Sequence, residues 1–523
     1  MGSSINQLRR VLSCSLVASL SVLMGCEPTY APRRTIDLRP QILEVSNHHG
    51  GTRHCTLVHE EIWYQSLGPE LEILSGKDGL RITSHEIEPF GQVGPISDMC
   101  IVDGEMWVVY AGDRVVRFGL DNPRRPRTLE QWKVEDLGLY PIEISLAGGD
   151  IWISGRDGTT AMSQLGTVRL SNLGRVGQVV ETPNGLFATA GRRIHRVDNG
   201  DYAGAATHLL PLPSDFGVDG ALVFVLQATE GASFGLMGPD LRELDSKTIL
   251  GTVRSVRTLD DRIFIVGDHQ MSGWKVDSSG ALFDPVFVQI KGARDLDILR
   301  ENYYAVGGTF GRAVFRMNAD ANGEADEFIS VERTPGRLEK AITDGQRILA
   351  GSDEGNWLYT IGGKCELSDK TLNATTGPRT SVTMSWGQAT IDSDREGVTI
   401  TLSSGETMKW SPRGQGLVYT LEVSENRLWI GFDEGIHVME FKEDKVSDLG
   451  NIILEGPVAW LFRPRVGDNI GYVSAYGGIG SAEVVPDPNA DEGLVRRVRP
   501  EDAIKAEREM RKAAGLPPME QDR

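Results

Sequence analysis

Four histidines close to the N-terminus form the densest group of candidate metal ligands in the chain. They are His48, His49, His54 and His59, and Cys55 lies among them. Imidazole and thiolate groups are ligands that zinc and copper favour in proteins. The alternative interpretation is a solvated connecting loop that leads into a strand containing one histidine. The sequence therefore offers a transition-metal site here as one of two hypotheses.

A second candidate site consists of oxygen ligands at Asn318, Asp320, Asn322 and Asp326. Their alternate spacing resembles the beginning of a calcium-binding loop. The pattern is incomplete, because the twelfth position is Ile329 rather than an acid. A polar hairpin turn is the simpler interpretation, and a calcium site is the alternative.

The short motifs of common catalytic sites are missing from the sequence. It contains no Gly-x-Ser-x-Gly elbow, no phosphate-binding Gly-x-x-x-x-Gly-Lys and no Cys-x-x-Cys-His haem site. The segment that begins at His59 starts like a zinc-protease helix, but Trp63 replaces the second histidine. An enzyme can still assemble its site from scattered loop residues. A non-catalytic protein is favoured, and an enzyme is the alternative.

The first 25 residues have the features of an export signal. Arg9 and Arg10 precede the apolar or small residues 11–24, and Gly25 and Cys26 follow. This arrangement resembles a bacterial lipoprotein signal, in which the cysteine is acylated and the chain is cut just before it. The apolar segment is shorter than the roughly 18 residues of a membrane-spanning helix. We expect lipidation at Cys26; an ordinary signal cut elsewhere, or a free cysteine in a buried strand, is the alternative.

The expected membrane location and the net charge of the chain limit which classes of partner it can bind. Glu27 stands where the enterobacterial pattern that this signal resembles has a retaining aspartate, which favours the outer membrane of the bacterial cell envelope. The chain has 54 Lys and Arg against 73 Asp and Glu, a net charge of −19. This excess of negative charge opposes binding to nucleic acid or to anionic lipid headgroups. We expect contact with a membrane through the lipid anchor and no nucleic-acid partner.

Cys55 and Cys100 occupy similar places in the sequence, eight residues before Trp63 and seven before Trp107. An export compartment permits a disulfide between them. The bond requires a Cα separation below about 7 Å, which a sequence does not reveal. A disulfide and two separately buried thiols remain the alternatives.

A short apolar run recurs along the chain at intervals of about 40 residues, a spacing typical of repeat proteins. Turn-forming residues lie between or after the runs at 111–113, 155–158, 260–261, 353–355 and 433–435. The longest interval has room for a weaker run within 384–400. The clear runs are centred on Trp63, Trp107, Trp152, Phe187, Phe224, Phe264, Tyr304, Leu349, Trp429 and Tyr472.

This period predicts an all-β fold, a β-propeller of four-stranded blades over residues 47–486. Four strands of five or six residues with short turns need about 40 residues. The runs are continuous, as expected for sheets covered on both faces. Ten or eleven repeats exceed the usual four to eight blades. Hairpins within longer blades, two rings and one large ring therefore all remain open.

Three segments resemble known propeller repeats. Residues 425–436, which include Leu428-Trp429-Ile430-Gly431, resemble the repeat of bacterial two-component sensor ectodomains. Residues 344–359 are similar to the repeat of quinoprotein-like propellers, which also builds a lipoprotein of the outer-membrane β-barrel assembly machine. Residues 117–123 resemble the LVIVD type of surface repeat. Each resemblance covers one repeat, so together they imply the architecture and no particular family.

The two ends of the chain differ from the repeats. Residues 26–46 contain Pro28, Pro32 and Pro40 and are expected to form a lipidated tether. Residues 487–523 are expected to form a tail with a short helix at 501–514, in which Glu501 and Lys505 form an i,i+4 pair.

Together these features predict a lipid-anchored cell-envelope β-propeller that acts as a protein- or glycan-binding scaffold without catalysis. Binding by such a fold comes from loops of several repeats, so the sequence singles out no binding residue. The alternatives are an envelope enzyme of the propeller type, such as a hydrolase, lyase or quinoprotein, and a metal-dependent sensor. The cofactor and the oligomeric state stay open.

Overall fold

The computed structural model consists almost entirely of strands, as the repeat period predicts. It describes residues 41–486 apart from 50–51, 88–90, 156–157, 164–167, 172–176, 289, 291, 300–301, 308–310, 318–324, 334, 336, 353–354, 371–381, 387–388, 395, 413–415, 425, 443–444 and 466–468. The strands form eleven four-stranded antiparallel sheets. We number these sheets 1 to 11 in chain order. The all-β prediction and the four-stranded repeat are confirmed.

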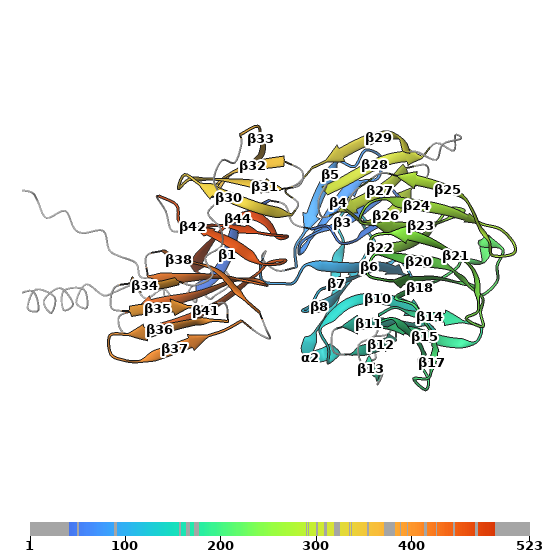
Figure 1. Ribbon diagram of the computed structural model, residues 1–523, viewed down its shortest axis with the longest axis horizontal. Coiled ribbons are helices and arrows are strands. Elements are labelled where there is room, and N and C mark those ends of the chain that lie inside the picture. The colour runs from blue at the N-terminus through green and yellow to red at the C-terminus, as the bar shows by residue number, and fades with distance from the viewer. Residues whose placement is uncertain are drawn as a thin grey trace, which may run out of the picture. The chain divides into compact units, whose positions relative to one another are not determined.

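Sheets 1 to 4 each consist of four consecutive strands (Figure 1). Sheet 1 contains β2 (Thr56–His59), β3 (Ile62–Leu67), β4 (Glu70–Ser75) and β5 (Arg81–His85). Sheet 2 contains β6 (Ile96–Val102), β7 (Glu105–Tyr110), β8 (Arg114–Gly119) and β9 (Arg127–Lys133), and α2 (Val134–Leu137) follows it. Sheet 3 contains β10 (Pro141–Ala147), β11 (Asp150–Gly155), β12 (Thr159–Ser163) and β13 (Val168–Ser171). Sheet 4 contains β14 (Val179–Thr182), β15 (Gly185–Ala190), β16 (Arg193–Arg196) and β17 (Tyr202–Gly204).

Sheets 5 to 7 repeat the same order. Sheet 5 contains β18 (His208–Pro211), β19 (Leu222–Gln227), β20 (Gly231–Met237) and β21 (Glu243–Leu250), with the 3-10 turn η1 (Ser214–Phe216) after its first strand. Sheet 6 contains β22 (Val253–Leu259), β23 (Arg262–Gly267), β24 (Met271–Val276) and β25 (Leu282–Val288). Sheet 7 contains β26 (Ala293–Leu299), β27 (Asn302–Gly307), β28 (Gly311–Met317) and β29 (Ala325–Glu332).

Sheets 8 to 11 complete the described chain. Sheet 8 contains β30 (Leu338–Thr343), β31 (Arg347–Ser352), β32 (Gly355–Thr360) and β33 (Cys365–Ser368). Sheet 9 contains β34 (Val382–Trp386), β35 (Ala389–Ser393), β36 (Val398–Leu402) and β37 (Thr407–Trp410). Sheet 10 contains β38 (Val418–Ser424), β39 (Arg427–Phe432), β40 (Gly435–Lys442) and β41 (Lys445–Ile453). Sheet 11 contains β42 (Val458–Phe462), β43 (Ile470–Ser474), β44 (Gly478–Pro486) and, beside β44, the first strand β1 (Gln41–His49).

The apolar runs found in the sequence are second strands of these sheets, and both faces of such strands are covered. In β7, Met106 and Val108 pack into the core shared with sheet 1, whereas Trp107 and Val109 pack into the core shared with sheet 3. Alternate residues of a strand point to opposite faces, so a continuous apolar run fills two cores at once. The turns expected at 260–261 and 433–434 connect β22 to β23 and β39 to β40.

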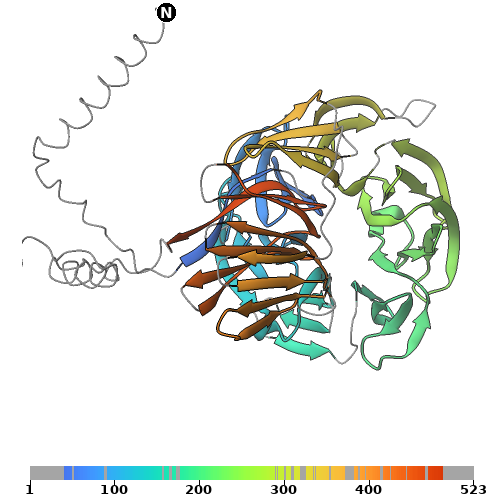
Figure 2. The same ribbon diagram turned by 60° about the vertical axis from the view of Figure 1, so that its left-hand side comes forward.

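The first strands of sheets 1 to 7 contact one another in a closed cycle. Contacts run from β2 through β6, β10, β14, β18 and β22 to β26, and β26 contacts β2 again. Trp63 and Leu74 of sheet 1 share a core with Tyr304, Val306 and Val314 of sheet 7. Chain order and spatial order therefore agree over these seven sheets, which Figure 2 shows from a second direction.

Sheets 8 to 11 are packed in a different order. Sheet 8 packs on sheet 11, for example through Trp357 and Trp460, and sheet 11 packs on sheet 10 through Tyr472 and Trp429. Sheet 10 in turn packs on sheet 9. The repeats thus divide into a group of seven sheets and a group of four, whose last sheet needs the N-terminal strand β1 for completion.

Residues 43–484 form one compact unit. The predicted signal at 1–25, the tether before residue 41 and the tail with its helix at 501–514 lie outside the described residues. Strand β1 begins at Gln41, inside the segment expected to be a tether over 26–46. Over the part of the chain that the structure describes, no helix has the length and apolar character needed to cross a bilayer.

Candidate functional site

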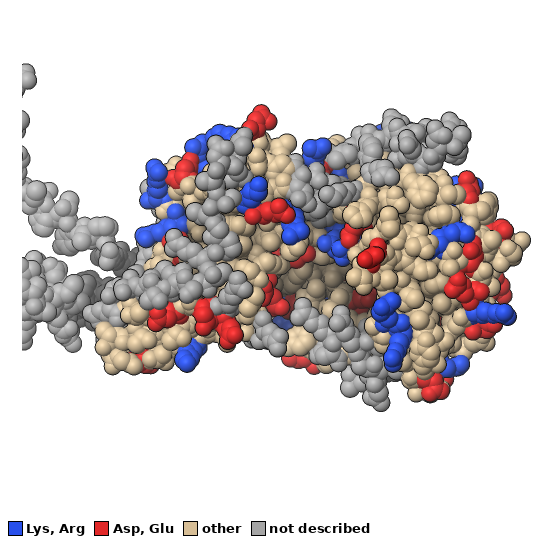
Figure 3. Space-filling view, viewed as in Figure 1, with Lys and Arg blue, Asp and Glu red and all other residues tan. Residues whose placement is uncertain are grey.

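A cavity of about 1670 Å³ lies at the first strands of sheets 1 to 7. Its wall includes residues of β6, β10, β14, β18, β22 and β26 and, on another side, residues of sheets 9 and 10 and of the connection from sheet 10 to sheet 11. Both acidic and basic side chains lie around the hollow in the middle of the surface shown in Figure 3. The volume exceeds the roughly 1,000 Å³ that bounds ordinary small-molecule pockets, so the cavity can hold a segment of a chain.

Polar side chains at the inner ends of sheets 2 to 5 connect each of these sheets to the next. In each case a side-chain oxygen accepts a hydrogen bond from a backbone N–H of the following sheet. These bonds satisfy backbone donors at the inner edge of each sheet, which would otherwise lose free energy on burial. They join Asp98 to Ile144 (2.9 Å), Ser145 to Val179 (3.1 Å), Gln178 to Leu209 (3.2 Å) and Gln227 to Val253 (2.9 Å).

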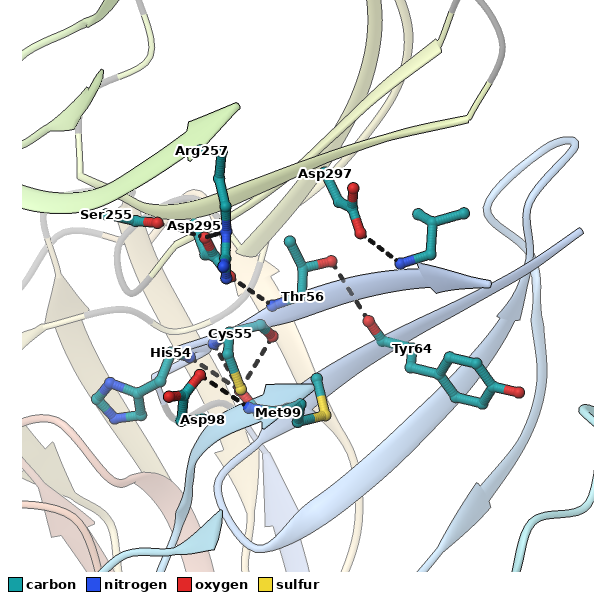
Figure 4. A network of polar contacts seen from close by, with 12 residues as sticks. His54, Cys55, Thr56, Tyr64, Asp98, Met99, Ser255, Arg257, Asp295 and Asp297 are labelled. Carbon is teal, nitrogen blue, oxygen red and sulfur yellow. Dashed lines mark hydrogen bonds and ion pairs between the residues drawn. The ribbon is translucent and has the colours of Figure 1, made fainter. Parts of the chain in front are cut away.

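The same kind of bond joins the last sheet of the closed cycle, sheet 7, to the first, sheet 1. Asp295 Oδ2 accepts from the N–H of Thr56 at 3.0 Å, and Asp297 Oδ2 accepts from the N–H of Val58 at 2.5 Å (Figure 4). The paired residues are 239 positions apart in the sequence. These two aspartates therefore close the cycle of sheets through hydrogen bonds as well as through apolar packing.

Arg257 reaches Asp295 from the neighbouring sheet 6. Its Nε and Nη2 donate to the two carboxylate oxygens at 2.9 and 2.6 Å, and the Ser255 hydroxyl donates at 2.6 Å. Asp295 is only 1% exposed. Burial by itself would lower the pKa of the Arg257 guanidinium, but the contact with Asp295 outweighs it and raises that pKa. The Arg257 guanidinium thus stays charged at any ordinary pH.

Two acids on sheets 2 and 3 face the same cavity with raised pKa values. Burial, and then the nearby charge of Asp98, raise the pKa of Glu143 to about 8. Burial also raises the pKa of Asp98 to about 6, although a hydrogen bond from the Ile144 amide and the charge of Arg257 lower it. Among the described residues, no group forms a hydrogen bond with the Glu143 carboxyl. Glu143 is therefore mostly protonated at pH 7 while the cavity is empty.

The cationic part of the wall comes from sheets 6 and 7. Arg254 donates to both carboxylate oxygens of Asp268, at 2.6 and 3.0 Å. Arg294 forms no hydrogen bond or ion pair with another described residue. Burial, and then the charge of Arg254, lower the pKa of Arg294. The charges of Glu455 and Asp268 oppose this shift without forming an ion pair with Arg294, so its guanidinium has no directly bonded partner in the described chain.

His437 lies on the opposite side of the cavity, in sheet 10, and is 2% exposed. Its Nδ1 is 2.6 Å from Asn451 Oδ1, and its ring stacks on Trp410 with 4.4 Å between the ring centroids. Its Nε2 is buried without a hydrogen-bond partner in the described chain and lies 3.7 Å from Asp448 Oδ1. Burial lowers its pKa, so the imidazole is neutral at pH 7.

The N-terminal histidines proposed as metal ligands have separate partners. His48 Nδ1 lies 2.7 Å from the Tyr472 hydroxyl, and His54 Nε2 lies 2.9 Å from Glu455 Oε1. His59 ends strand β2, and the side chain of His49 is outside the described residues. In the portion of the chain that is described, no three His, Cys, Asp or Glu side chains are grouped as metal ligands.

The structure describes little of the other site residues that the sequence suggested, which are the lipidated cysteine and the calcium-type loop. The lipidation residue Cys26 and the calcium-type residues Asn318, Asp320 and Asn322 lie outside the described residues. Asp326 belongs to β29, and its side chain is also outside them. The lipid and calcium hypotheses therefore stay predictions.

Cys55 and Cys100 are both free thiols in the structure. Cys55 packs with Met99 in the core between sheets 1 and 2, whereas Cys100 packs with Trp107 in the core between sheets 2 and 3. Adjacent strand residues point to opposite faces, so Cys100 is directed away from the core that holds Cys55. Of the two alternatives, the structure contains the separate thiols. Burial raises the pKa of Cys100 to about 12.

The cavity residues themselves were missed in the sequence, although a signal for them exists. In six of the first seven repeats, the residue nine positions before the central aromatic residue lines the cavity. This constant spacing marks the position of the first strand that faces inward. The pairs are His54 and Trp63, Asp98 and Trp107, Glu143 and Trp152, Gln178 and Phe187, Ser255 and Phe264, and Asp295 and Tyr304.

No protein-family model and no curated protein matches the chain. Among solved structures, the computationally designed protein Ika8 is 12% identical with a TM-score of 0.39, over 61% of this chain and 100% of that chain. The extracellular domain of a protein described as a hybrid two-component system of B. thetaiotaomicron is 9% identical with a TM-score of 0.35, over 86% of this chain and 82% of that chain. Similarities this low carry no argument about function, which depends on the chain's own geometry.

Proposed function

We propose that this protein is a lipid-anchored β-propeller of the bacterial cell envelope, which binds a protein or glycan partner in its central cavity without catalysis. The seven sheets whose first strands contact one another in a closed cycle are taken as the blades. In a closed set of blades the inner sheet edges are short and protected, here by side chains that accept hydrogen bonds from backbone N–H groups, so polar side chains line that region.

The observation that carries the proposal is the cavity of about 1670 Å³ with charged and hydrogen-bonding side chains from many separate repeats. Such a wall offers a wide set of weak contacts to a polymer segment rather than one tight pocket for a metabolite. The N-terminal motif that ends at Cys26 supports the envelope location and the anchor.

Crosslinking of the natively lipidated protein in cells, followed by affinity purification and mass spectrometry, tests this function. A double variant, Glu143→Gln with Arg294→Gln, alters two charges of the cavity wall. Its control, Glu230→Gln with Arg192→Gln, removes the same charges from exposed positions outside the wall. We expect envelope partners to be recovered with the native and control proteins and lost with the cavity variant. Equal recovery with all three proteins would contradict binding in the cavity.

An envelope enzyme is the second candidate, and one observation favours it. Glu143 and Asp98 have pKa values raised to about 8 and about 6, within the range where carboxyl groups serve as general acids and bases. Turnover of envelope glycans or peptides that is abolished by Glu143→Gln would establish this function in place of the non-catalytic one.

A further inference from the structure

The charged residues that sheets 1 to 7 contribute to the cavity wall are separated by sign. Sheets 2 and 3 with their connections contribute four acids to the described wall and no Lys or Arg. Sheets 6 and 7 contribute Arg254, Arg257 and Arg294, together with Asp295, whose charge is neutralised by Arg257. One side of the cavity is therefore acidic and another is basic. The four acids are Asp98, Asp113, Glu135 and Glu143.

The two sides are far apart in the cycle of sheets. Glu143 belongs to the first strand of sheet 3 and Arg294 to the first strand of sheet 7. In a closed cycle of seven, these sheets are as widely separated as the cycle allows. An acidic group and a basic group thus face the same space from opposite sides, too far apart in the cycle to be neighbours.

Neither Glu143 nor Arg294 forms a hydrogen bond or an ion pair with another described residue, and opposite charges act on them only from a distance, Arg257 on Glu143 and Glu455 and Asp268 on Arg294. A buried charge without a partner is costly, and that cost appears as a pKa shifted toward the neutral form. The pKa of Glu143 is raised and that of Arg294 is lowered, in each case by burial first. A third wall group, the Nε2 of the buried His437, also has no hydrogen-bond partner within the described chain. A ligand that supplies partners for Glu143 and Arg294 would relieve the two charge penalties.

We propose that the cavity binds a peptide segment that carries both an amine and a carboxylate. The amine is directed to Glu143 and Asp98, and the carboxylate is directed to Arg294 beside Arg254. This inference rests on the proposed function and names the class of its ligand.

Other ligand classes satisfy the wall less well. A neutral glycan supplies neither an anion for Arg294 nor a cation that favours the ionised form of Glu143, and a ligand of one sign supplies only one of the two. A nucleic acid would bring many negative charges to a protein of net charge −19. A peptide with lysine and glutamate side chains supplies one group of each sign on a chain of adjustable length.

Calorimetric titration with synthetic peptides tests the inference. The probes have blocked ends and contain one lysine, one glutamate and zero to four intervening alanines. Extended, they span about 7 to 21 Å. In matched probes, acetyl-lysine replaces lysine or glutamine replaces glutamate, so that one charge is removed at a time. At the length that binds best, we expect each replacement to weaken binding about tenfold or more.

Two single variants assign each charge of the peptide to its side of the wall. In Glu143→Gln, the acetyl-lysine and lysine probes should bind equally, while the preference for glutamate over glutamine is retained. In Arg294→Gln, the glutamine and glutamate probes should bind equally, while the preference for lysine over acetyl-lysine is retained. Glu230→Gln and Arg192→Gln should bind as the native protein does. Thermal unfolding of every variant shows that a loss of binding is not a loss of folding.

The pH dependence of binding gives an independent readout. The ionised fraction of a group with a pKa of about 8 rises from about a tenth at pH 7 to about nine-tenths at pH 9. We therefore expect affinity for the lysine probe to rise about tenfold over this range, since lysine itself stays charged. Asp98 and Arg257, the charges nearest Glu143, are both ionised throughout, and His208 and His437 stay neutral. The rise should disappear in Glu143→Gln.

Equal binding of charged and neutralised probes, or no binding by any probe, would overturn the inference. So would cavity binding of neutral envelope oligosaccharides that does not depend on Glu143 or Arg294. In each of these cases the crosslinking experiment still reports separately on the proposed function. Partners lost with the cavity variant would keep that function while the peptide class is rejected.

Discussion

Replacing Asp295 with alanine should loosen the junction between sheet 7 and sheet 1. The carboxylate accepts hydrogen bonds from the Thr56 amide, the Ser255 hydroxyl and two nitrogens of Arg257. Of the bonds that cross from sheet 7 to sheet 1 at this point, only that from Val58 to Asp297 would remain.

The size of the effect follows from what the truncation leaves behind. Removing one member of a buried ion pair costs about 3 to 5 kcal/mol, because the other charge stays without a partner. The Arg257 side chain is 33% exposed and so recovers part of this cost from water. An unsatisfied amide at Thr56 adds about 1 to 3 kcal/mol. We expect the free energy of unfolding of this unit to fall by about 3 to 5 kcal/mol.

Urea unfolding and hydrogen exchange measure the two parts of this prediction. The unfolding midpoint should fall, and amide exchange should accelerate in residues 54–67 and 293–307 but not in sheets 8 to 11. The change Asp215→Ala, at an exposed position without a hydrogen-bonded carboxylate in the described chain, is the control and should alter neither. In Asp295→Ala with Arg257→Ala, the loss should be smaller than the sum of the single losses by about 1 to 3 kcal/mol.

Unchanged exchange at Thr56 would refute the reasoning even if the midpoint fell. In that case Asp295 would act only as the local partner of Arg257, and the closing contact would depend on the apolar core alone. Additive losses in the double variant would likewise show that the two side chains act independently.

Three further predictions concern other parts of the molecule. Because the pKa of Glu143 is raised to about 8, the stability that its protonated form contributes is fully present below about pH 4.5 and is lost as the pH rises to 8. In urea titrations, Glu143→Gln should flatten this fall and raise the free energy of unfolding at pH 7 by up to about 3 kcal/mol. Gly435→Ala should destabilise sheet 10 by at least about 2 kcal/mol in thermal unfolding, because Gly435 has a φ of 142° and its Cβ would lie 1.9 Å from the Ile452 carbonyl oxygen. Cys55 and Cys100 should each be alkylated in denaturant without a reductant, and a native mass two units lower with no alkylation would indicate the disulfide instead.

The strands and turns could be predicted because their signals are local. Trp107 and its apolar neighbours form one short run, and Asp260-Asp261 is a two-residue connection between adjacent strands. A continuous apolar run already implies that both faces of its strand are covered. None of these inferences needs to know which sheets are neighbours.

The site could not be predicted in the same way, because each of its residues is a single polar side chain in a strand. Asp98 and Glu143 become one acidic wall only when sheets 2 and 3 pack side by side. The histidines closer together in sequence are instead drawn to different partners, as His48 is to Tyr472 and His54 to Glu455. The constant spacing before the central aromatic residue was available in the sequence and would have indicated the inward position.

By itself, the sequence determined that the chain is all-β, built of four-stranded repeats and strongly acidic, because these properties depend on local pattern and composition. The tertiary structure decided the division into seven and four sheets, the return of β1 to sheet 11 and the membership of the cavity wall. Similar repeats carry similar local patterns, so nothing in the pattern of one repeat marks it as the last of its group. That choice depends on contacts such as Thr56 with Asp295, which form between residues 239 positions apart only when the cycle of sheets closes.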